Sequence, residues 1–359
     1  MLDLNDSTPK YHQLKKYLKE QIRRGELTPG AKLPSENELA RQFRLSRHTV
    51  RQALSDLENE GLIQREQGRG TFCGRIPKPA GQNIAVLTTY ISDYIFPAII
   101  RGIEEVFSEA GYNLLLANTN NNRLKEGQCL TNLLEQNIAA LIVEPTKSAL
   151  ENTNLELYRE LTARGIPYLM LHAFYPDLDP AYIVMDDEQG GYLAANYLLQ
   201  LGHRQIAGLF KTDDQQGVKR QRGFLTALSE YGVTPHPGFV GNYQTEQIRS
   251  YPYQFVRGLL GKEDHPTAVV CYNDQIALEV LEAVRNEGLK VPDDISLVGY
   301  DDSSLATATE VKLTTIKHPK AEMGRQAARL IIDRLGRRID LPRFVYPAEL
   351  ILRSSCRNI

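Results

Sequence analysis

The sequence predicts an α/β protein in two parts: a small N-terminal head of three helices and a β-hairpin, and a larger body of two lobes with parallel sheets. The length of 359 residues exceeds one ordinary domain. From residue 83 onward, short apolar runs alternate with helix-length segments, which is typical of parallel sheets covered by helices. Residues 1–75 hold 14 Lys and Arg against 10 Asp and Glu, whereas the remainder holds 28 against 34. A basic head on an acidic body favours a nucleic-acid partner for the head.

Two helices are expected at the start of the head. Apolar residues recur at helical spacing over about residues 10–24, and Gly25 follows as a stop signal. Ser35 and Glu38 have the spacing of a capping box, which predicts a second helix over about residues 35–43.

A third helix is expected to contact DNA. Ser46 is its expected N-cap, and its buried stripe consists of Val50, Ala53, Leu54 and Leu57. The polar side chains beside or opposite that stripe are Arg47, His48, Arg51 and Gln52. Two short helices joined by a tight turn, the second opening with Arg and His, indicate a helix-turn-helix whose second helix enters the major groove. Arginine can donate two hydrogen bonds to guanine there.

A wing is expected after the third helix. The runs 62–66 and 70–73 predict two strands, and residues 67–70 form the Gly-flanked basic tip between them. Arg69 at this tip would be attracted into a minor groove.

The head resembles the GntR-type winged-helix DNA-binding domain in residues 34–40 (PSENELA), 45–54 (LSRHTVRQAL) and 68–72 (GRGTF). The resemblance implies operator binding, with the third helix in the major groove and the wing beside it. The DNA-binding residues expected on this basis are Lys10, Glu36, Arg47, His48, Thr49, Arg51, Gln67 and Arg69. The alternative is a winged helix used only for protein contact, in which the arginines form a solvated face.

We expect three segments: a DNA-binding head over residues 1–74, a linker over 75–82 and a body over 83–359. The linker contains two prolines and breaks every periodicity. Strands of the body are expected at 84–89, 113–117, 140–143, 168–171, 183–185, 206–210, 267–271 and 296–299. Helices are expected near 97–110, 124–137, 154–164, 188–201, 218–231, 246–260, 274–287 and 319–335.

Polar side chains follow the strands of the body, where open parallel sheets bind their ligands. They include Tyr90, Glu144, His172, Asp186, Asn273 and Asp301. Planar Arg, Asn, Asp and Glu side chains can each engage two adjacent hydroxyls of a sugar, and Tyr94 and Phe96 could cover its apolar face. Asp274 and Asp302 are better explained as helix caps than as ligands.

The body resembles the LacI/GalR-type effector domain, which is itself similar to periplasmic sugar-binding proteins. The resemblance is carried by residues 201–207 (LGHRQIA), 272–277 (YNDQIA) and 291–302 (VPDDISLVGYDD). It implies effector contacts at Arg220, Asn273 and Asp301 and on the loops after the first strands. The full expected set is Tyr90, Tyr94, Phe96, Glu144, His172, Arg220, Asn273, Asp301 and His318.

A GntR-type head on a LacI/GalR-type body resembles the arabinose-responsive repressors of Gram-positive bacteria, and residues 88–97 (TTYISDYIFP) support that match. The resemblance implies L-arabinose as the effector. We expect a homodimer that meets the two half-sites of a palindromic operator and is released when the sugar binds. Another neutral monosaccharide is the alternative effector. A sugar phosphate is disfavoured, because Glu144 and Asp301 are acidic and only Arg220 is clearly placed in the cleft. LacI-type repressors join head to body by a hinge helix, which the Pro-broken linker is not expected to form.

Other classes of function lack support in the sequence. There is no GxSxG, HExxH, GxGxxG or Walker A motif, so an enzyme that uses Glu144 and Asp301 as a carboxylate pair is the least favoured alternative. No two of the seven histidines are three or four positions apart, as two metal ligands on one helix would be, so we expect no metal. No cofactor is expected either. No apolar run reaches membrane-spanning length, and the N-terminus lacks the features of a signal peptide. We therefore expect a cytoplasmic protein with reduced thiols.

Overall fold

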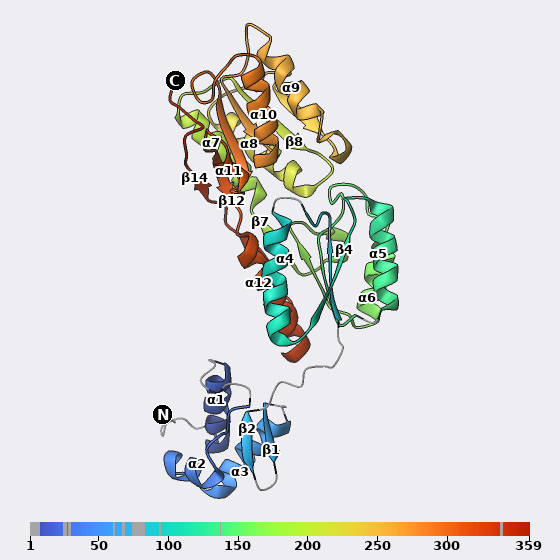
Figure 1. Ribbon diagram of the computed structural model, residues 1–359, viewed down its shortest axis with the longest axis vertical. Helices are drawn as coiled ribbons and strands as arrows, with labels where there is room; N and C mark the ends of the chain where they lie inside the picture. The colour runs from blue at the N-terminus through green and yellow to red at the C-terminus, as the bar shows by residue number, and fades with distance from the viewer. Residues whose placement is uncertain are drawn as a thin grey trace. The chain divides into compact units, whose positions relative to one another are not determined.

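The computed structural model describes residues 8–23, 27, 30–59, 62–66, 69–73, 83–92, 95–136, 138–337 and 340–359 (Figure 1). The chain divides into two compact units, Met1–Gly81 and Gln82–Ile359. The linker expected at 75–82 lies outside the described residues, as does the tip of the wing at Gln67.

The first unit contains the predicted three helices and hairpin: α1 (Lys10–Arg23), α2 (Glu36–Phe43), α3 (Arg47–Asn59), β1 (Ile63–Glu66) and β2 (Gly70–Cys73). The capping box of α2 is confirmed, because Ser35 and Glu38 bond reciprocally. The cap of α3 is also confirmed, since the Thr49 N–H donates to Ser46 Oγ at 3.1 Å. The predicted stripe of α3 is fully buried and packs against α1.

Lobe 1 of the second unit is a six-stranded parallel sheet in the order β13-β7-β6-β5-β3-β4. Its strands are β3 (Asn83–Thr88), β4 (Asn113–Asn118), β5 (Ala140–Val143), β6 (Tyr168–Leu171), β7 (Tyr182–Met185) and β13 (Arg343–Tyr346). One face is covered by α4 (Phe96–Ala110) and α12 (Lys320–Arg337), and the other by α5 (Arg123–Glu135) and α6 (Leu155–Ala163) (Figure 1).

Lobe 2 repeats this architecture with a sheet in the order β14-β12-β11-β10-β8-β9, in which only the β12–β14 pair is antiparallel. Its strands are β8 (Ile206–Lys211), β9 (Val240–Tyr243), β10 (Ala268–Cys271), β11 (Ser296–Asp301), β12 (Thr314–Lys317) and β14 (Leu350–Ile351). The helices α7 (Asp187–Gln200) and α8 (Gln215–Glu230) cover one face, and α9 (Tyr251–Leu260) and α10 (Asp274–Asn286) cover the other. The short helix α11 (Leu305–Ala308) follows β11.

The structure adds strands that the apolar runs did not predict. These are β9, β13 and β14, which lie at the edges of the sheets, and β12, which the sequence analysis treated only as an extended run before His318. The exposed residues of β13 alternate with half-buried ones, so this strand carries no continuous apolar run. The helix expected at 246–260 is divided, because a 3₁₀ turn at Thr245–Gln247 precedes α9 and Pro252 marks the first turn of that helix.

The chain crosses between the lobes three times, after β7, after β12 and between β13 and β14. Each lobe has one position where the strand order reverses, between β3 and β5 in lobe 1 and between β8 and β10 in lobe 2. Loops at the carboxyl ends of strands diverge at such switch points and leave room for a ligand. The topology therefore directs attention to the residues after β3, β5, β8 and β10.

The helices α7 and α8 approach each other closely because two glycines face the partner backbone. A Cβ atom on Gly191 would lie 2.0 Å from the carbonyl oxygen of Arg220, and a Cβ atom on Gly223 would lie 1.9 Å from that of Glu188. Real Cβ contacts are never this short, so any other residue would force the helices apart. The contact holds Arg220 of α8 beside Asp187, the first residue of α7.

We expect Gly223→Ala to lower the free energy of unfolding by about 1–3 kcal/mol, because the added methyl group cannot fit without moving α8. Urea titration of the purified chain would measure this change. Gly258→Ala is the control, since a Cβ atom there meets nothing within 4 Å. Equal stability of the Gly223→Ala and wild-type proteins would contradict the close packing of α7 and α8.

Candidate functional site

The exposed face of α3 carries the side chains expected to contact DNA. Arg47, His48 and Arg51 are exposed, while Thr49 is half-buried and its hydroxyl lies 2.8 Å from that of Ser46. Lys10 is the first residue of α1 and is exposed as well. The first turn of α3 therefore presents two basic side chains at a helix N-terminus, where DNA phosphates and base edges are bound in helix-turn-helix proteins.

Glu36, the first residue of α2, orients Arg51. Its carboxylate accepts from Arg51 Nη2 at 3.1 Å and lies 3.8 Å from Arg65 Nη1. The side chain of Arg51 remains 64% exposed, so the pair restrains the direction of the guanidinium without covering it. Arg69 lies over the ring of Phe72 on the wing, with 5.9 Å from the guanidinium carbon to the ring centre. Gln67, the other wing residue expected at DNA, is outside the described residues.

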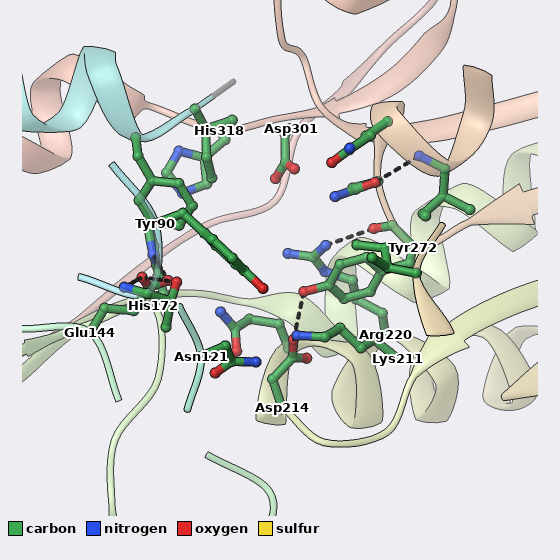
Figure 2. Close-up of a pocket in the computed structure, with 18 of the residues that line it drawn as sticks. Tyr90, Asn121, Glu144, His172, Lys211, Asp214, Arg220, Tyr272, Asp301 and His318 are labelled. Carbon is green, nitrogen blue, oxygen red and sulfur yellow. Dashed lines mark hydrogen bonds and ion pairs between the residues drawn. The ribbon is translucent and has the colours of Figure 1, made fainter. Parts of the chain in front are cut away.

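A cavity of about 340 Å³ lies between the two lobes of the second unit (Figure 2). It is lined by eight of the nine residues expected to bind an effector: Tyr90, Phe96, Glu144, His172, Arg220, Asn273, Asp301 and His318. The ninth, Tyr94, is outside the described residues. Residues separated by more than 200 positions in the sequence thus meet in one pocket, at the carboxyl ends of strands from both sheets.

Glu144 holds His172 in place on the lobe 1 side. Its Oε1 lies 2.9 Å from His172 Nδ1, and its Oε2 accepts from the Thr89 N–H at 2.8 Å and from the Thr88 and Thr89 hydroxyls. Burial alone would raise the pKa of Glu144, but the hydrogen bond and charge of His172, together with the Thr89 donors, lower it. One oxygen of this carboxylate therefore orients His172, while Thr88 and Thr89 hold the other oxygen in place.

His172 and His318, which both line the cavity, have ring nitrogens without a hydrogen-bond partner in the described part of the chain. Among the described residues, His172 Nε2 and both ring nitrogens of His318 have no hydrogen-bond partner although they are buried. The two rings lie edge to face with centres 5.1 Å apart, and Phe96 packs against His172 at 6.0 Å. Burial, followed by the charges of His172 and Lys320, places the pKa of His318 well below its ordinary value, so this ring is neutral. A neutral imidazole can both donate and accept a hydrogen bond, as a sugar hydroxyl requires.

Arg220 is fixed on the lobe 2 side by an ion pair and two aromatic rings. Its Nε donates to Asp187 Oδ1 at 2.8 Å, and its Nη1 donates to the Tyr272 carbonyl oxygen at 2.7 Å. The guanidinium lies 3.4 Å from the ring centre of Tyr300 and 4.9 Å from that of Tyr272. This buried arginine is therefore pre-oriented, and its charge is matched by Asp187.

Comparison with known proteins follows the same division of the chain. Residues 10–73 match the model of the family described as bacterial regulatory proteins, gntR family, and residues 195–356 match that of the periplasmic binding protein-like domain. The chain is 50% identical over 359 residues to the arabinose metabolism transcriptional repressor of Geobacillus stearothermophilus, covering 98% of each chain. It is 46% identical to the repressor of the same name from Halalkalibacterium halodurans, covering 96% of each.

The chain belongs to the arabinose metabolism transcriptional repressor family. It is a transcriptional repressor with a GntR-type DNA-binding head and a LacI-like effector domain, and not an enzyme. Among solved structures, the LacI family transcriptional regulator of Enterococcus faecium with bound ribose matches with a TM-score of 0.67 at 26% identity, covering 77% of this chain and 100% of that chain. The regulator CcpA of Lactococcus lactis matches with a TM-score of 0.68 at 23% identity over 77% of this chain and 100% of that chain, which shows the shared fold.

The pocket of this family member also contains residues that the sequence analysis missed. They include Asn121, Asp187, Lys211, Asp214, Arg249 and Tyr272. Lys211 is the last residue of β8 and follows an apolar run, which is the signal that identified Glu144 and His172. Asp214 was not selected as a pocket residue because an Asp before a helix is explained by capping. It does cap α8, since its Oδ1 accepts from the Gly217 N–H at 2.7 Å.

The two lobes are hydrogen bonded to each other beside the pocket. Asn121 Nδ2 donates to Thr245 Oγ1 at 2.6 Å, and the Gln215 N–H donates to Ser148 Oγ at 2.9 Å. Lys147 of lobe 1 also forms an ion pair with Glu246 of lobe 2. These contacts hold the two lobes together beside the cavity, and a wider separation of the lobes would break them.

Several pocket residues have a backbone conformation that residues other than glycine rarely adopt. The φ angle is 96° at Asp301, 64° at His172 and 52° at Asn121. Left-handed backbone at non-glycine residues costs free energy and is concentrated at functional sites. These three positions aim side chains into the cavity at the expense of local stability.

The roles expected for Asp274 and Asp302 as helix caps are wrong. Asn273 caps α10, because its Oδ1 accepts from the Ile276 N–H at 2.9 Å. Asp274 instead accepts from the Ser303 N–H at 2.7 Å and from the Thr315 hydroxyl at 2.7 Å, and so supports the loop after β11. Asp302 forms an ion pair with Arg353 at 2.5 Å.

Within the described part of the chain, no group of three or more His, Cys, Asp and Glu side chains could hold a metal ion. The four cysteines are all free. No described helix is both long enough and apolar enough to cross a bilayer.

We expect Asp274→Asn to flatten the pH dependence of stability between about pH 4 and pH 7. Burial, followed by the charge of Asp301, raises the pKa of Asp274 to about 7, against the opposing hydrogen bonds of Thr315 and Ser303. In this range the folded protein keeps a proton that the unfolded chain has lost, so wild-type stability falls as the pH rises. Through Asp274, the free energy of unfolding of the wild-type protein falls by about 1–4 kcal/mol across this range.

Urea titrations of both proteins at several pH values would measure the effect, with the exposed Asp264→Asn as the control. Parallel pH curves for wild type and Asp274→Asn would show that this carboxyl is not perturbed.

Proposed function

We propose that this protein is a sugar-responsive repressor that binds operator DNA as a dimer through its winged-helix heads and is released when L-arabinose binds between the lobes. The observation that carries the proposal is the inter-lobe cavity, in which His172 and His318 present unpartnered ring nitrogens next to Arg220 and Asp301. A DNA-binding head on the same chain gives such a pocket a regulatory use.

A neutral monosaccharide suits this cavity. Its volume, about 340 Å³, lies at the small end of the 300–1,000 Å³ typical of ligand pockets. Its acidic lining residues are Glu144, Asp187, Asp214, Glu279 and Asp301, and its basic ones are Lys211, Arg220 and Arg249. This excess of carboxylates disfavours a phosphate. The rings of Tyr90 and Phe96 supply an apolar face for the carbon side of a sugar ring.

L-Arabinose is the effector that we favour among neutral monosaccharides. The two relatives that match nearly the whole chain are named as repressors of arabinose metabolism. A structural neighbour at 26% identity holds ribose, another pentose. A different neutral monosaccharide remains the second candidate, because the lining groups recognise hydroxyls in general.

The proposed DNA-binding residues are Lys10, Glu36, Arg47, His48, Thr49, Arg51, Gln67 and Arg69. Arg47 and Arg51 would donate to base edges in the major groove, and Arg69 would enter the minor groove. Two heads in a dimer would meet the two half-sites of a palindrome. We assign residues 1–74 to this head, 75–82 to a linker and 83–359 to the effector domain, and we propose the cytoplasm as the site of action.

The proposed mechanism is a population shift. Sugar binding favours the closed cleft, because ligand contacts to both lobes are made only when the lobes meet. Closure would move the two effector domains of a dimer relative to each other and spoil the spacing of the heads. Linkage then requires DNA to weaken sugar binding by the same factor.

We expect L-arabinose to weaken operator binding by about 5- to 150-fold, the usual range of allosteric coupling. Fluorescence anisotropy of labelled operator DNA, at fixed salt with and without the sugar, would measure the change. D-Glucose serves as the comparison sugar. Equal operator affinity in the presence and absence of L-arabinose would refute the proposed response.

We expect Arg47→Ala and Arg220→Ala to separate the two activities. Loss of Arg47 removes a base contact and should weaken operator binding by at least about tenfold while leaving sugar affinity unchanged. Loss of Arg220 leaves Asp187 buried without its partner and should abolish sugar binding, which gives a repressor that is not induced. Calorimetry with L-arabinose and anisotropy with operator DNA measure the two effects, and an inducible Arg220→Ala protein would contradict the pocket assignment.

A further inference from the structure

Lys211 occupies the position in lobe 2 that corresponds to the start of the Tyr90 loop in lobe 1. It ends β8, the strand next to the switch point of its sheet, as Thr88 ends β3 in lobe 1. The residue is 6% exposed and lines the inter-lobe cavity, where Figure 2 shows its side chain beside Asp214. Open parallel sheets bind ligands at this position, so the placement alone makes Lys211 a candidate for ligand contact.

Two carboxylates lie beside the ammonium group of Lys211, and one of them, Asp213, also lies 3.8 Å from Lys147 Nζ. Its Nζ donates to Asp214 Oδ2 at 2.9 Å and lies 3.4 Å from Asp213 Oδ1. Burial alone would lower the pKa of Lys211, but Asp214 and Asp213 outweigh burial and raise it, so the group stays charged. An ammonium group has three N–H donors, and these two contacts leave at least one donor for the cavity.

Asp214 has hydrogen-bond donors other than the lysine, whereas Asp213 Oδ1 has no hydrogen-bond partner among the described residues and lies 3.4 Å from Lys211 Nζ. Asp214 accepts from the Tyr272 hydroxyl at 2.7 Å in addition to the backbone N–H that it caps. Asp213 accepts from the Thr245 N–H at 3.0 Å and from the Thr245 hydroxyl at 2.6 Å. An apolar residue here would leave both buried carboxylates without this cation, so the lysine has a structural role as well. Because Lys211 also lines the cavity and keeps an N–H donor that the carboxylates do not use, this donor is available to a ligand.

We propose that Lys211 is a specificity-determining residue of the effector pocket: it donates a hydrogen bond to a sugar hydroxyl, and Asp213 and Asp214 cancel its charge so that the pocket selects a neutral sugar over a phosphorylated one. The inference rests on the proposed function, because it assigns a donor within the same pocket. It also explains how a pocket with a buried lysine remains unsuited to a phosphate. The charge of the lysine is already matched inside the protein, as that of Arg220 is by Asp187.

The first test compares Lys211→Met with the wild-type protein by titration calorimetry with L-arabinose. Loss of a charged donor should raise the Kd about 10- to 100-fold. Lys262→Met, an exposed lysine of the same lobe, should leave the Kd unchanged. Operator binding without sugar should be unaffected in both variants, because it depends on the head.

Lys211→Met removes a cation from two buried carboxylates, of which only Asp213 keeps a second cation, Lys147 at 3.8 Å, so a second variant guards against misfolding. Lys211→Met/Asp213→Asn removes one charge of each sign, and Asp213 does not line the cavity. This double variant should show the same loss of affinity. Unchanged affinity for L-arabinose in a folded Lys211→Met or double variant would overturn the role of Lys211, while wild-type binding would still stand. Absence of wild-type binding to L-arabinose would instead overturn the proposed effector.

The second test concerns charge. Asp213→Asn removes one of the two countercharges and leaves the shape of the cavity intact, so Lys211 becomes attractive to an anion. The ratio of affinities for β-L-arabinopyranose 1-phosphate and L-arabinose should rise at least about tenfold relative to wild type. An unchanged ratio in the folded variant would overturn the claim that these carboxylates set the preference for a neutral sugar.

Discussion

Parallel strands bring all their carboxyl ends to one edge of a sheet, and in this protein two such edges face each other across one cavity. The rest of the effector domain depends on that constraint. It determines that Glu144 and His172, which follow β5 and β6, lie opposite Lys211, which ends β8, and Asn273, which follows β10. It also explains why the pocket contains residues from almost every part of the chain beyond the head.

Buried charge is the main cost of building such a pocket, and each of the buried cations Arg220 and Lys211 has a local anion. Arg220 is paired with Asp187, Lys211 with Asp213 and Asp214, and the Glu144 carboxylate is surrounded by donors. Matched groups act as oriented dipoles rather than as net charges, which suits the recognition of hydroxyls. The two histidines complete the set, with ring nitrogens that have no hydrogen-bond partner among the described residues.

Much of this arrangement could be predicted from the sequence. Alternating apolar runs predicted the buried strands and most helices, because parallel strands need continuous apolar segments. The edge strands β13 and β14 escaped prediction since their burial is partial.

Glu144, His172 and Asp301 were found because each follows an apolar run, and Lys211 obeys the same rule but was not selected. Asp274 was misassigned because its side chain bonds to Ser303 and Thr315, contacts that cross from α10 to the next strands and leave no local pattern. The head was the easier part, since its caps and buried stripe are local features of the sequence.

The two lobes have the same strand order, so each contributes an equivalent wall to the cavity. A substitution at the end of a strand in one lobe alters that wall and leaves the other intact. The hydrogen bonds that close the cleft, such as the one between Asn121 and Thr245, come from loops that do not include His172, His318 or Arg220. Closure and ligand contact therefore share Asn121, which lines the cavity, whereas His172, His318 and Arg220 line the cavity without forming the bonds between the lobes. Such a fold can acquire a new effector by successive changes in one wall while it continues to respond to whatever it binds.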